Sequence, residues 1–200
     1  MKVFIGTVTT GACLSVVSQT KADNMFQITP SASAAKVIAN DNCFQVCFTD
    51  PNQGTASADY IASKGLATKV AVIYNSSDAY SSGIYDNFKA EAAAKGLDLV
   101  ASEAFTGDSK QDFSSQLSKI KASGAELIFL PIYYQEASLI LSQAKNAGIT
   151  AKFFGCDGLD GLLNIENFDK SLAENVMLLT PFAACLLYTS PSPRDSTSSR

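Results

Sequence analysis

Hydroxyl side chains follow the first two predicted strands of the chain. Thr10 comes shortly after the first of these strands, and Ser31, Ala32 and Ser33 follow the second. In parallel α/β sheets, ligands bind outside the carboxyl ends of the strands. Hydroxyl groups and the free N–H groups at a helix start donate hydrogen bonds, and the helix dipole favours negative charge there. These positions therefore suit a carboxylate.

A carboxylate and three aromatic side chains follow later strands. Asp157 is an acceptor that suits an ammonium group, and Tyr80, Tyr133 and Tyr134 offer flat apolar walls with one polar tip each. Together with the hydroxyl groups, these side chains suit a zwitterion that bears an apolar side chain. The residues after the strands therefore predict a site for a free amino acid.

Each of these residues also has a plainer structural interpretation. Ser31 and Ser33 can serve as helix caps, Tyr133 and Tyr134 can belong to a core, and the Gly-Cys-Asp-Gly stretch at 155–158 can be a simple turn. These alternatives stay open for each residue taken singly.

The composition excludes several classes of function. The chain has 200 residues, of which 46% are hydrophobic and 17% charged, so it has ample material for a buried core. It contains no His, which removes His-based nucleophile systems and His-containing metal sites. The net charge is −4 without a basic run, so no nucleic-acid partner is expected.

An enzyme is not predicted either. The strand ends offer one carboxylate and no second titrating partner for an acid and base pair. The glycines at 155–161 lack the spacing of a dinucleotide fingerprint, and no Gly-Lys-Ser/Thr loop is present. We therefore expect no catalytic residue, no metal and no cofactor.

Strands and helices alternate along most of the chain. Continuous apolar runs such as residues 69–75 indicate parallel strands that are buried on both faces. Strands are predicted at residues 2–6, 25–29, 43–48, 69–75, 97–105, 125–131, 150–155 and 176–182, and helices at 11–24, 52–65, 81–96, 112–124 and 135–148, with a looser helical stretch after 155. This pattern predicts an α/β fold with parallel sheets covered by helices on both faces.

The chain is predicted to divide into two lobes. Residues 65–68 are the expected crossing between a first lobe at 1–66, which has too few elements to be complete, and a second lobe at 67–184. The last residues, 185–200, are rich in Ser and contain both Arg residues of the chain. That shift in composition predicts a disordered, non-native tail.

The cysteines and the amino-terminal segment give little functional signal. Cys43 and Cys47 flank an apolar stretch that would hold them about 13 Å apart in a strand, too far for a disulfide. Both are expected to be small buried hydrophobic residues. The first 18 residues contain an early Lys and Cys13, but their Thr and Gly residues favour a strand and loop over a signal segment. No stretch is apolar enough to insert into a membrane.

Several separated motifs resemble one known family. They include ITPSASAAKV at 28–37, FTDPNQGTASADYIASKG at 48–65 and FFGCDGLD at 153–160. The chain resembles the branched-chain amino-acid binding proteins of ABC importers over about residues 3–184. This resemblance implies the type I periplasmic-binding-protein fold, in which two hinged lobes enclose the ligand. Because the family normally has further elements before and after this region, the chain is expected to be an internal fragment.

The resemblance also implies a role for each candidate residue. It implies that Thr10 holds the ligand carboxylate and that the loop of Ser31, Ala32 and Ser33 binds both ends of the zwitterion; Ser33 is more often Thr in the family. Tyr80 and one of Tyr133 and Tyr134 would close over the ligand, and Asp157 would take its ammonium group.

The expected function is therefore capture and delivery. The protein would bind an aliphatic or small neutral amino acid outside the cytoplasm, as a periplasmic protein or a lipoprotein, and deliver it to an ABC permease. The alternative is a ligand-sensing domain of the same fold in a regulator or receptor. That alternative would need a DNA-binding or transmembrane segment, which these residues do not supply.

Overall fold

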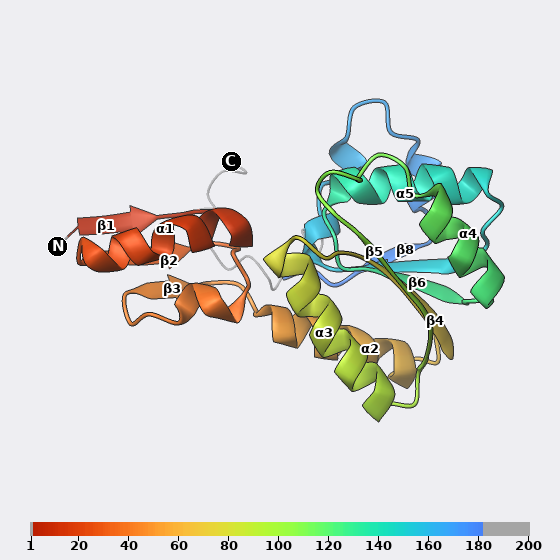
Figure 1. Cartoon of the computed structure of the whole chain (residues 1–200), viewed down its shortest axis with the longest axis horizontal. Coiled ribbons are helices and arrows are strands. Elements are labelled where there is room, and N and C mark those ends of the chain that lie inside the picture. The colour runs from red at the N-terminus through yellow and green to blue at the C-terminus, as the bar shows by residue number, and fades with distance from the viewer. Residues whose placement is uncertain (1, 182–200) are drawn as a thin grey trace, which may run out of the picture.

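Two parallel sheets organise the chain, one in each of two lobes (Figure 1). The computed structural model describes residues 2–181. The predicted tail at 185–200 lies outside the described residues. Both sheets are flanked by helices, so the predicted α/β class with parallel strands is confirmed.

The first lobe contains a three-stranded sheet in the order β1-β2-β3. Its elements are β1 (Lys2–Ile5), α1 (Thr10–Ala22), β2 (Met25–Thr29), the 3-10 turn η1 (Ala35–Ile38) and β3 (Cys43–Gln45). Cys13 and Val17 of α1 pack on Val37 and Cys43, which forms a small core on one face of this sheet. The apolar side of α1 therefore explains why that face is covered.

The second lobe contains a five-stranded sheet in the order β5-β4-β6-β7-β8. Its strands are β4 (Lys69–Asn75), β5 (Asp98–Phe105), β6 (Leu127–Leu130), β7 (Lys152–Gly155) and β8 (Val176–Leu178), and its helices are α2 (Asp50–Ser63), α3 (Ala79–Ala94), α4 (Ser114–Ser123) and α5 (Tyr134–Asn146). All neighbouring strands run parallel.

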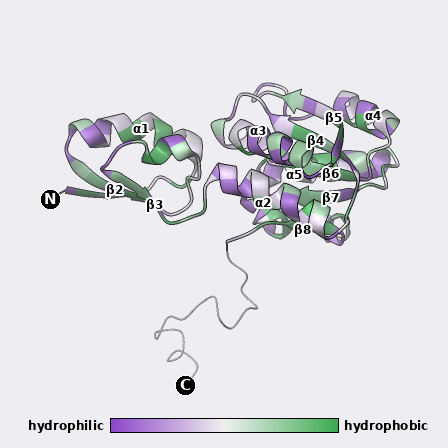
Figure 2. Cartoon of the chain, turned by 90° about the horizontal axis from the view of Figure 1, so that it is seen from below, coloured by the Kyte–Doolittle hydropathy of each residue, from purple (hydrophilic) through white to green (hydrophobic). Residues whose placement is uncertain are grey.

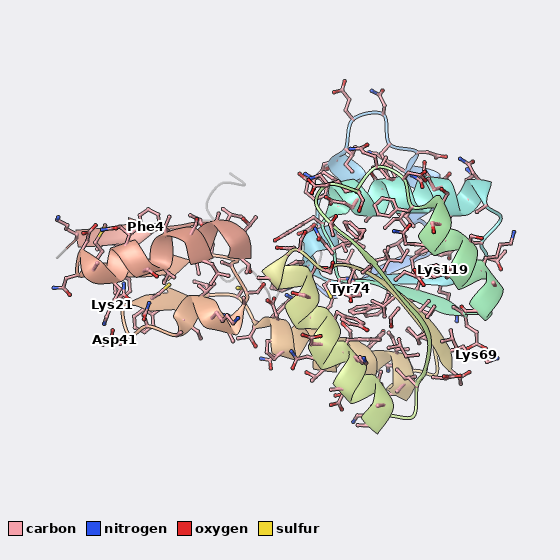
Figure 3. All side chains as sticks on the ribbon, viewed as in Figure 1. Phe4, Lys21, Asp41, Lys69, Tyr74 and Lys119 are labelled. Carbon is pink, nitrogen blue, oxygen red and sulfur yellow. The ribbon has the colours of Figure 1, made fainter. Side chains whose placement is uncertain are left out.

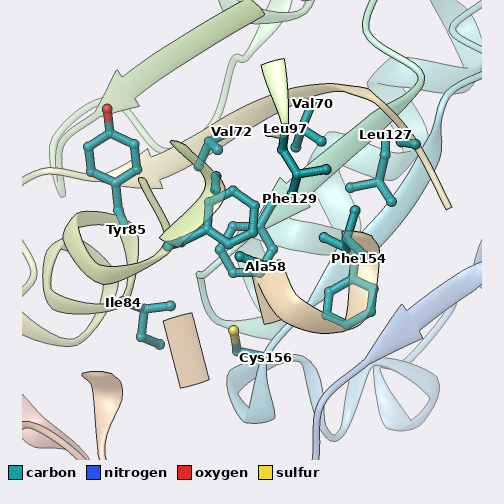
Figure 4. Close-up of a cluster of buried hydrophobic side chains, with 14 of the residues drawn as sticks. Ala58, Val70, Val72, Ile84, Tyr85, Leu97, Leu127, Phe129, Phe154 and Cys156 are labelled. Carbon is teal, nitrogen blue, oxygen red and sulfur yellow. The ribbon is translucent and has the colours of Figure 1, made fainter. Parts of the chain in front are cut away.

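Alternating side chains of β4 fill two cores on opposite faces of this sheet. Val70 and Val72 pack beneath α2 and α3, as Figure 4 shows for the same cluster. Ala71 and Ile73 point the other way and pack beneath α4 and α5. Because successive side chains of a strand point to opposite faces, a strand buried on both sides must be apolar throughout. Residues 69–75 form a continuous apolar run because β4 is buried on both faces.

Helix α2 packs in the second lobe, although the predicted boundary at 65–68 assigned it to the first. Its residues Ala58 and Ile61 join the core of the five-stranded sheet together with Ile84 of α3. The chain leaves the first lobe after β3 and enters α2 directly (Figure 1). The observed crossing therefore lies at residues 46–49. An apolar helix face shows that a helix is buried, but not on which sheet.

A close approach of two helices fixes α2 in this position. A Cβ atom at Gly54 would lie 2.6 Å from the Ile84 carbonyl oxygen and 2.7 Å from the Phe88 backbone nitrogen. Since no side chain fits there, glycine allows α2 to pack against α3.

The face of the first sheet opposite α1 carries exposed apolar side chains. Val3 is 51% exposed, Ile5 79% and Phe44 49%. Figure 2 shows hydrophobic residues along β2 and β3 of this sheet. Helices on both faces are thus present on the second sheet, whereas among residues 2–181 the first sheet is covered on one face only.

Several local predictions differ from the structure. Strand β3 ends at Gln45 rather than at residue 48, because the chain turns there toward the other lobe. The helical stretch after β7 consists of three short 3-10 turns, η2 (Asp157–Leu159), η3 (Leu162–Asn164) and η4 (Lys170–Ala173). Cys43 is buried as predicted, but Cys47 is only half-buried, and neither forms a disulfide.

None of the helices within residues 2–181 has the length and the apolar character needed to cross a bilayer.

Candidate functional site

A cleft of about 440 Å³ lies where the two lobes meet at the carboxyl ends of their strands. Its walls come from the first lobe on one side and from the loops after β4, β6 and β7 on the other. The lining residues are Val8, Thr9, Ser31, Tyr80, Tyr133, Tyr134, Gln135, Asp157, Gly158 and Asp160. The structure thus brings together five of the predicted site residues, from segments far apart in the sequence.

Tyr80 and Asp157 form the polar centre of the second-lobe wall. The Tyr80 hydroxyl donates to Asp157 Oδ1 at 2.6 Å and accepts from the Gly158 N–H at 2.9 Å. The Tyr133 ring stacks on the Tyr80 ring, with centroids 4.8 Å apart. This wall therefore presents the Asp157 carboxylate beside the two flat rings of Tyr80 and Tyr133.

Burial raises the pKa of the Asp157 carboxyl, and the hydrogen bond from Tyr80 opposes that shift. A half-buried carboxylate without a cationic partner costs free energy in this setting. A positively charged ligand group would remove that cost. The electrostatics of the cleft therefore favour a cation beside Asp157.

Ser31 marks the first-lobe side of the cleft. It is half-buried, and its hydroxyl donates to the Val8 carbonyl oxygen at 2.7 Å. This bond joins the loops after β1 and β2, so two strand ends form one wall. Tyr134, the first residue of α5, completes the opposite wall.

Thr10, Ala32 and Ser33 lie beneath the cleft and do not line it. Thr10 is 1% exposed, and its Oγ1 accepts from the N–H groups of Ser33 at 3.2 Å and Ala34 at 3.3 Å. The hydroxyl predicted to meet a ligand is thus occupied in holding the loop after β2. The Ser33 hydroxyl is buried without a hydrogen-bond partner among the described residues.

Two residues of α2 that the sequence analysis did not single out lie behind Asp157. Gln53 is fully buried, and its Oε1 accepts from the Asp157 backbone N–H at 3.3 Å. Asp50 is 1% exposed. Pro51 in the first turn signals only the start of a helix. Gln53 and Asp50 lie near the site because α2 contacts the loop after β7. The spacing of residues along the chain does not predict that contact.

Gly158 is a third such residue, and here the sequence did contain a signal. A Cβ atom at this position would lie 2.7 Å from both the Tyr80 hydroxyl and the Ile132 carbonyl oxygen. The glycine in the Gly-Cys-Asp-Gly stretch is therefore required by the close approach of Tyr80. Asp157 and Gly158 of that stretch begin the 3-10 turn η2, so the plainer interpretation describes their backbone while Asp157 still faces the cleft.

Known proteins match both the sequence and the fold. The family model described as periplasmic binding protein matches residues 1–194. The "Leu/Ile/Val-binding protein homolog 3" of Brucella melitensis is 33% identical over 161 residues, which cover 80% of this chain and 43% of that protein.

Two solved structures are similar as well. The branched-chain amino-acid transporter substrate-binding protein LivJ from Streptococcus pneumoniae, in complex with isoleucine, gives a TM-score of 0.84 at 27% identity, over 92% of this chain and 52% of that one. The leucine-binding protein LivK from Thermotoga maritima gives a TM-score of 0.74 at 29% identity, over 78% of this chain and 44% of that one.

The chain spans about half the length of these relatives or somewhat less. The predicted resemblance is confirmed on three grounds: the family model, the relatives and the parallel two-lobed fold. The chain belongs to the periplasmic binding proteins.

Proposed function

We propose that this chain forms part of a solute-binding protein that captures an aliphatic or small neutral amino acid between its lobes. The observation that carries the proposal is the pairing of Tyr80 and Asp157 on one wall of the cleft, across from Ser31 on the other. A carboxylate beside aromatic walls suits an ammonium group attached to an apolar side chain.

Asp157 takes the ligand ammonium group in this proposal. Tyr80, Tyr133 and Tyr134 enclose the apolar side chain, since all three line the same cleft. Support comes from the relatives, because the Brucella protein is named for Leu, Ile and Val and the Streptococcus structure contains isoleucine.

The loop of Ser31, Ala32 and Ser33 takes the ligand carboxylate. Thr10 contributes by fixing this loop through the N–H groups of Ser33 and Ala34. The role of Thr10 is thus positioning, while Ser31 is the hydroxyl at the cleft surface.

The captured amino acid passes to the permease of an ABC importer, and the protein works outside the cytoplasm. Membership of the periplasmic binding proteins supports both statements. Rotation of the lobes about the crossing at residues 46–49 would open and close the cleft, as in other hinged binding proteins.

The test is a thermal-shift panel of the common amino acids on the purified chain, followed by calorimetry of each stabilising ligand. Leu, Ile or Val should raise the melting temperature, whereas benzoate should not, because benzoate lacks an ammonium group. A chain stabilised by no amino acid, or equally by benzoate, would contradict the proposal.

Asp157→Asn tests the charge at the centre of the site. Leaving a buried charge without its partner costs about 2 to 5 kcal/mol, which is a loss of roughly thirty-fold to several thousand-fold in affinity. The unliganded melting temperature should stay close to that of the parent. Asp98→Asn removes the same charge from an exposed strand end and should leave the affinity unchanged. Normal affinity with a much lower melting temperature would make Asp157 a structural residue of the turn.

A further inference from the structure

Asp50, the first residue of α2, is a carboxyl group enclosed at the junction of the lobes. It is 1% exposed, and its backbone N–H donates to the Ser33 carbonyl oxygen of the first lobe at 2.9 Å. On the other side it faces Gly83 of α3, where a Cβ atom would lie 3.5 Å from Asp50 Oδ2. The carboxyl group is therefore packed between elements of both lobes.

Neither carboxylate oxygen of Asp50 accepts a hydrogen bond from the residues that the structure describes. The Ser33 hydroxyl is close, but it too has no partner of ordinary hydrogen-bond geometry. An ionised carboxylate without donors is costly to bury, so a group in this setting takes up a proton.

The charged groups that face Asp50 are acidic. Asp157 follows β7 and Asp78 caps the start of α3, and both carboxylates act on Asp50. Three groups that are neutral at ordinary pH complete its titratable surroundings: Cys47 of the crossing segment, Cys156 after β7 and Tyr133 before α5. Among residues 2–181, the charged groups that act on Asp50 thus include no cation.

Lysine side chains do not supply that cation. None of the ion pairs within residues 2–181 includes Asp50. Lys21, Lys69 and Lys119 lie on outer parts of the lobes, away from their junction (Figure 3). A ligand that carries a positive charge would supply such a cation.

Burial is the main reason that the pKa of Asp50 rises to about 7, and the charges of Asp157 and Asp78 act in the same direction. The Ser33 hydroxyl opposes the rise. Near neutral pH, small changes in its surroundings therefore shift the Asp50 carboxyl group between the protonated and the ionised form.

We propose that Asp50 holds a proton while the cleft is empty and releases it to solvent when the ammonium group of the ligand arrives. This inference rests on the proposed function, which brings that ammonium group to Asp157 and the loop at 31–33. Asp50 adjoins both, and a nearby positive charge favours the ionised form of a carboxyl group. Capture of one amino acid is thereby coupled to the release of about one proton.

The ligand-free half of the inference can be tested without an amino acid. Carbon-13 NMR of the Asp carboxyl groups should show one group in the parent chain that titrates near neutral pH. That signal should be lost in Asp50→Asn and kept in Asp98→Asn. If Asp50→Asn does not fold, Ser33→Ala serves instead, because loss of the opposing hydroxyl should move the same midpoint upward. Titration of Asp50 in the ordinary acid range would overturn the inference.

Calorimetry with leucine tests the coupling. In two buffers with different ionisation heats at about pH 6.5, the parent should release up to about one proton per leucine, and Asp50→Asn close to none. The affinity of the parent should rise by up to about tenfold per pH unit between about pH 5 and 7, and that of Asp50→Asn should stay nearly constant.

Two results would overturn the coupling alone: leucine binding without proton release, or the same release from Asp50→Asn, which would identify Asp157 as the source. A chain that binds no amino acid although Asp50 titrates near neutral pH would instead contradict the proposed function, and the coupling with it.

Discussion

Gly158 sets the distance between Tyr80 and the loop that carries Asp157. The Tyr80 hydroxyl bonds to both the Asp157 carboxylate and the Gly158 N–H, so this loop is held at two points by one side chain. Any side chain at residue 158 would occupy the space of that hydroxyl. The most specific part of the site therefore depends on a residue that contributes no functional group.

Gly158→Ala should weaken amino-acid binding and lower stability. The added methyl group would displace Tyr80 or the loop, and such overpacking costs about 1 to 3 kcal/mol. Calorimetry and thermal unfolding measure the two effects. Gly107→Ala is the matched control, because a Cβ atom there would make an ordinary contact of 3.8 Å with Ser77 Oγ. Equal behaviour of the two variants would contradict the role of Gly158.

Asp50 should make the stability of the fold depend on pH. Its carboxyl pKa is 3.8 in an unperturbed chain and about 7 in the fold, so the folded state holds the proton more tightly. The stabilisation is complete below about pH 4 and is lost as the pH rises to about 7, by at most about 1.4 kcal/mol per pH unit.

Denaturant unfolding of the parent and Asp50→Asn across this pH range checks the effect. The unfolding free energy of the parent minus that of Asp50→Asn should fall by several kcal/mol in total as the pH rises, and then stay constant above about pH 7. Asp157 and Asp78 also have raised pKa values, but both are present in each protein, so the comparison reports Asp50 together with its coupling to these two groups. A difference that does not vary with pH would contradict the prediction.

At the scale of elements, strands and helices were predictable where they carry their own pattern. Residues 69–75 form an apolar run because β4 is buried on both faces, and Ile84 and Phe88 show helical spacing because α3 buries one side. The lobe to which α2 belongs was not predictable. Gly54 allows α2 to pack closely against Ile84 of α3, and this contact is visible only in the folded structure.

The site was predictable in part for the same reason. Tyr80 and Asp157 follow strands directly, and topology alone places such residues at one edge of a sheet. Thr10 also follows a strand, but its hydroxyl turns inward to the N–H groups of Ser33 and Ala34. Gln53 reaches Asp157 across elements separated by about half the chain, so no local pattern marks it.

Gly54→Ala and Gly11→Ala should have opposite effects. A Cβ atom at Gly54 would overlap the backbone of α3, so Gly54→Ala should lower the unfolding free energy by about 1 to 3 kcal/mol or more. At Gly11, an exposed helical position, a Cβ atom would meet nothing within 4 Å. Gly11→Ala should therefore raise the unfolding free energy by up to about 1 kcal/mol. Denaturant unfolding measures both, and a tolerated Gly54→Ala would contradict the packing of α2 on α3.

At the scale of the whole molecule, the two lobes differ in how fully their sheets are covered. The five-stranded sheet has a core on each face, while the three-stranded sheet presents Val3, Ile5 and Phe44 to solvent. Burial of apolar surface is the main source of stability. The second lobe should therefore be the more stable part.

Hydrogen exchange followed by mass spectrometry should show this difference directly. Amides of β4, β6 and β7 should exchange slowly, whereas those of β1, β2 and β3 should exchange faster, because their sheet is buried on one face. Equal protection of the two sheets in the monomeric chain would contradict the expectation.

The tyrosines that line the cleft also give the chain an intrinsic optical probe. The chain contains no Trp and seven Tyr, so its ultraviolet emission comes from tyrosine alone. Tyr80, Tyr133 and Tyr134 contribute to that emission from within the cleft, and the Tyr80 hydroxyl is bonded to a carboxylate that can quench it. A ligand that draws Asp157 away from Tyr80 would change the brightness of the protein, so occupancy of the cleft can be followed without any label.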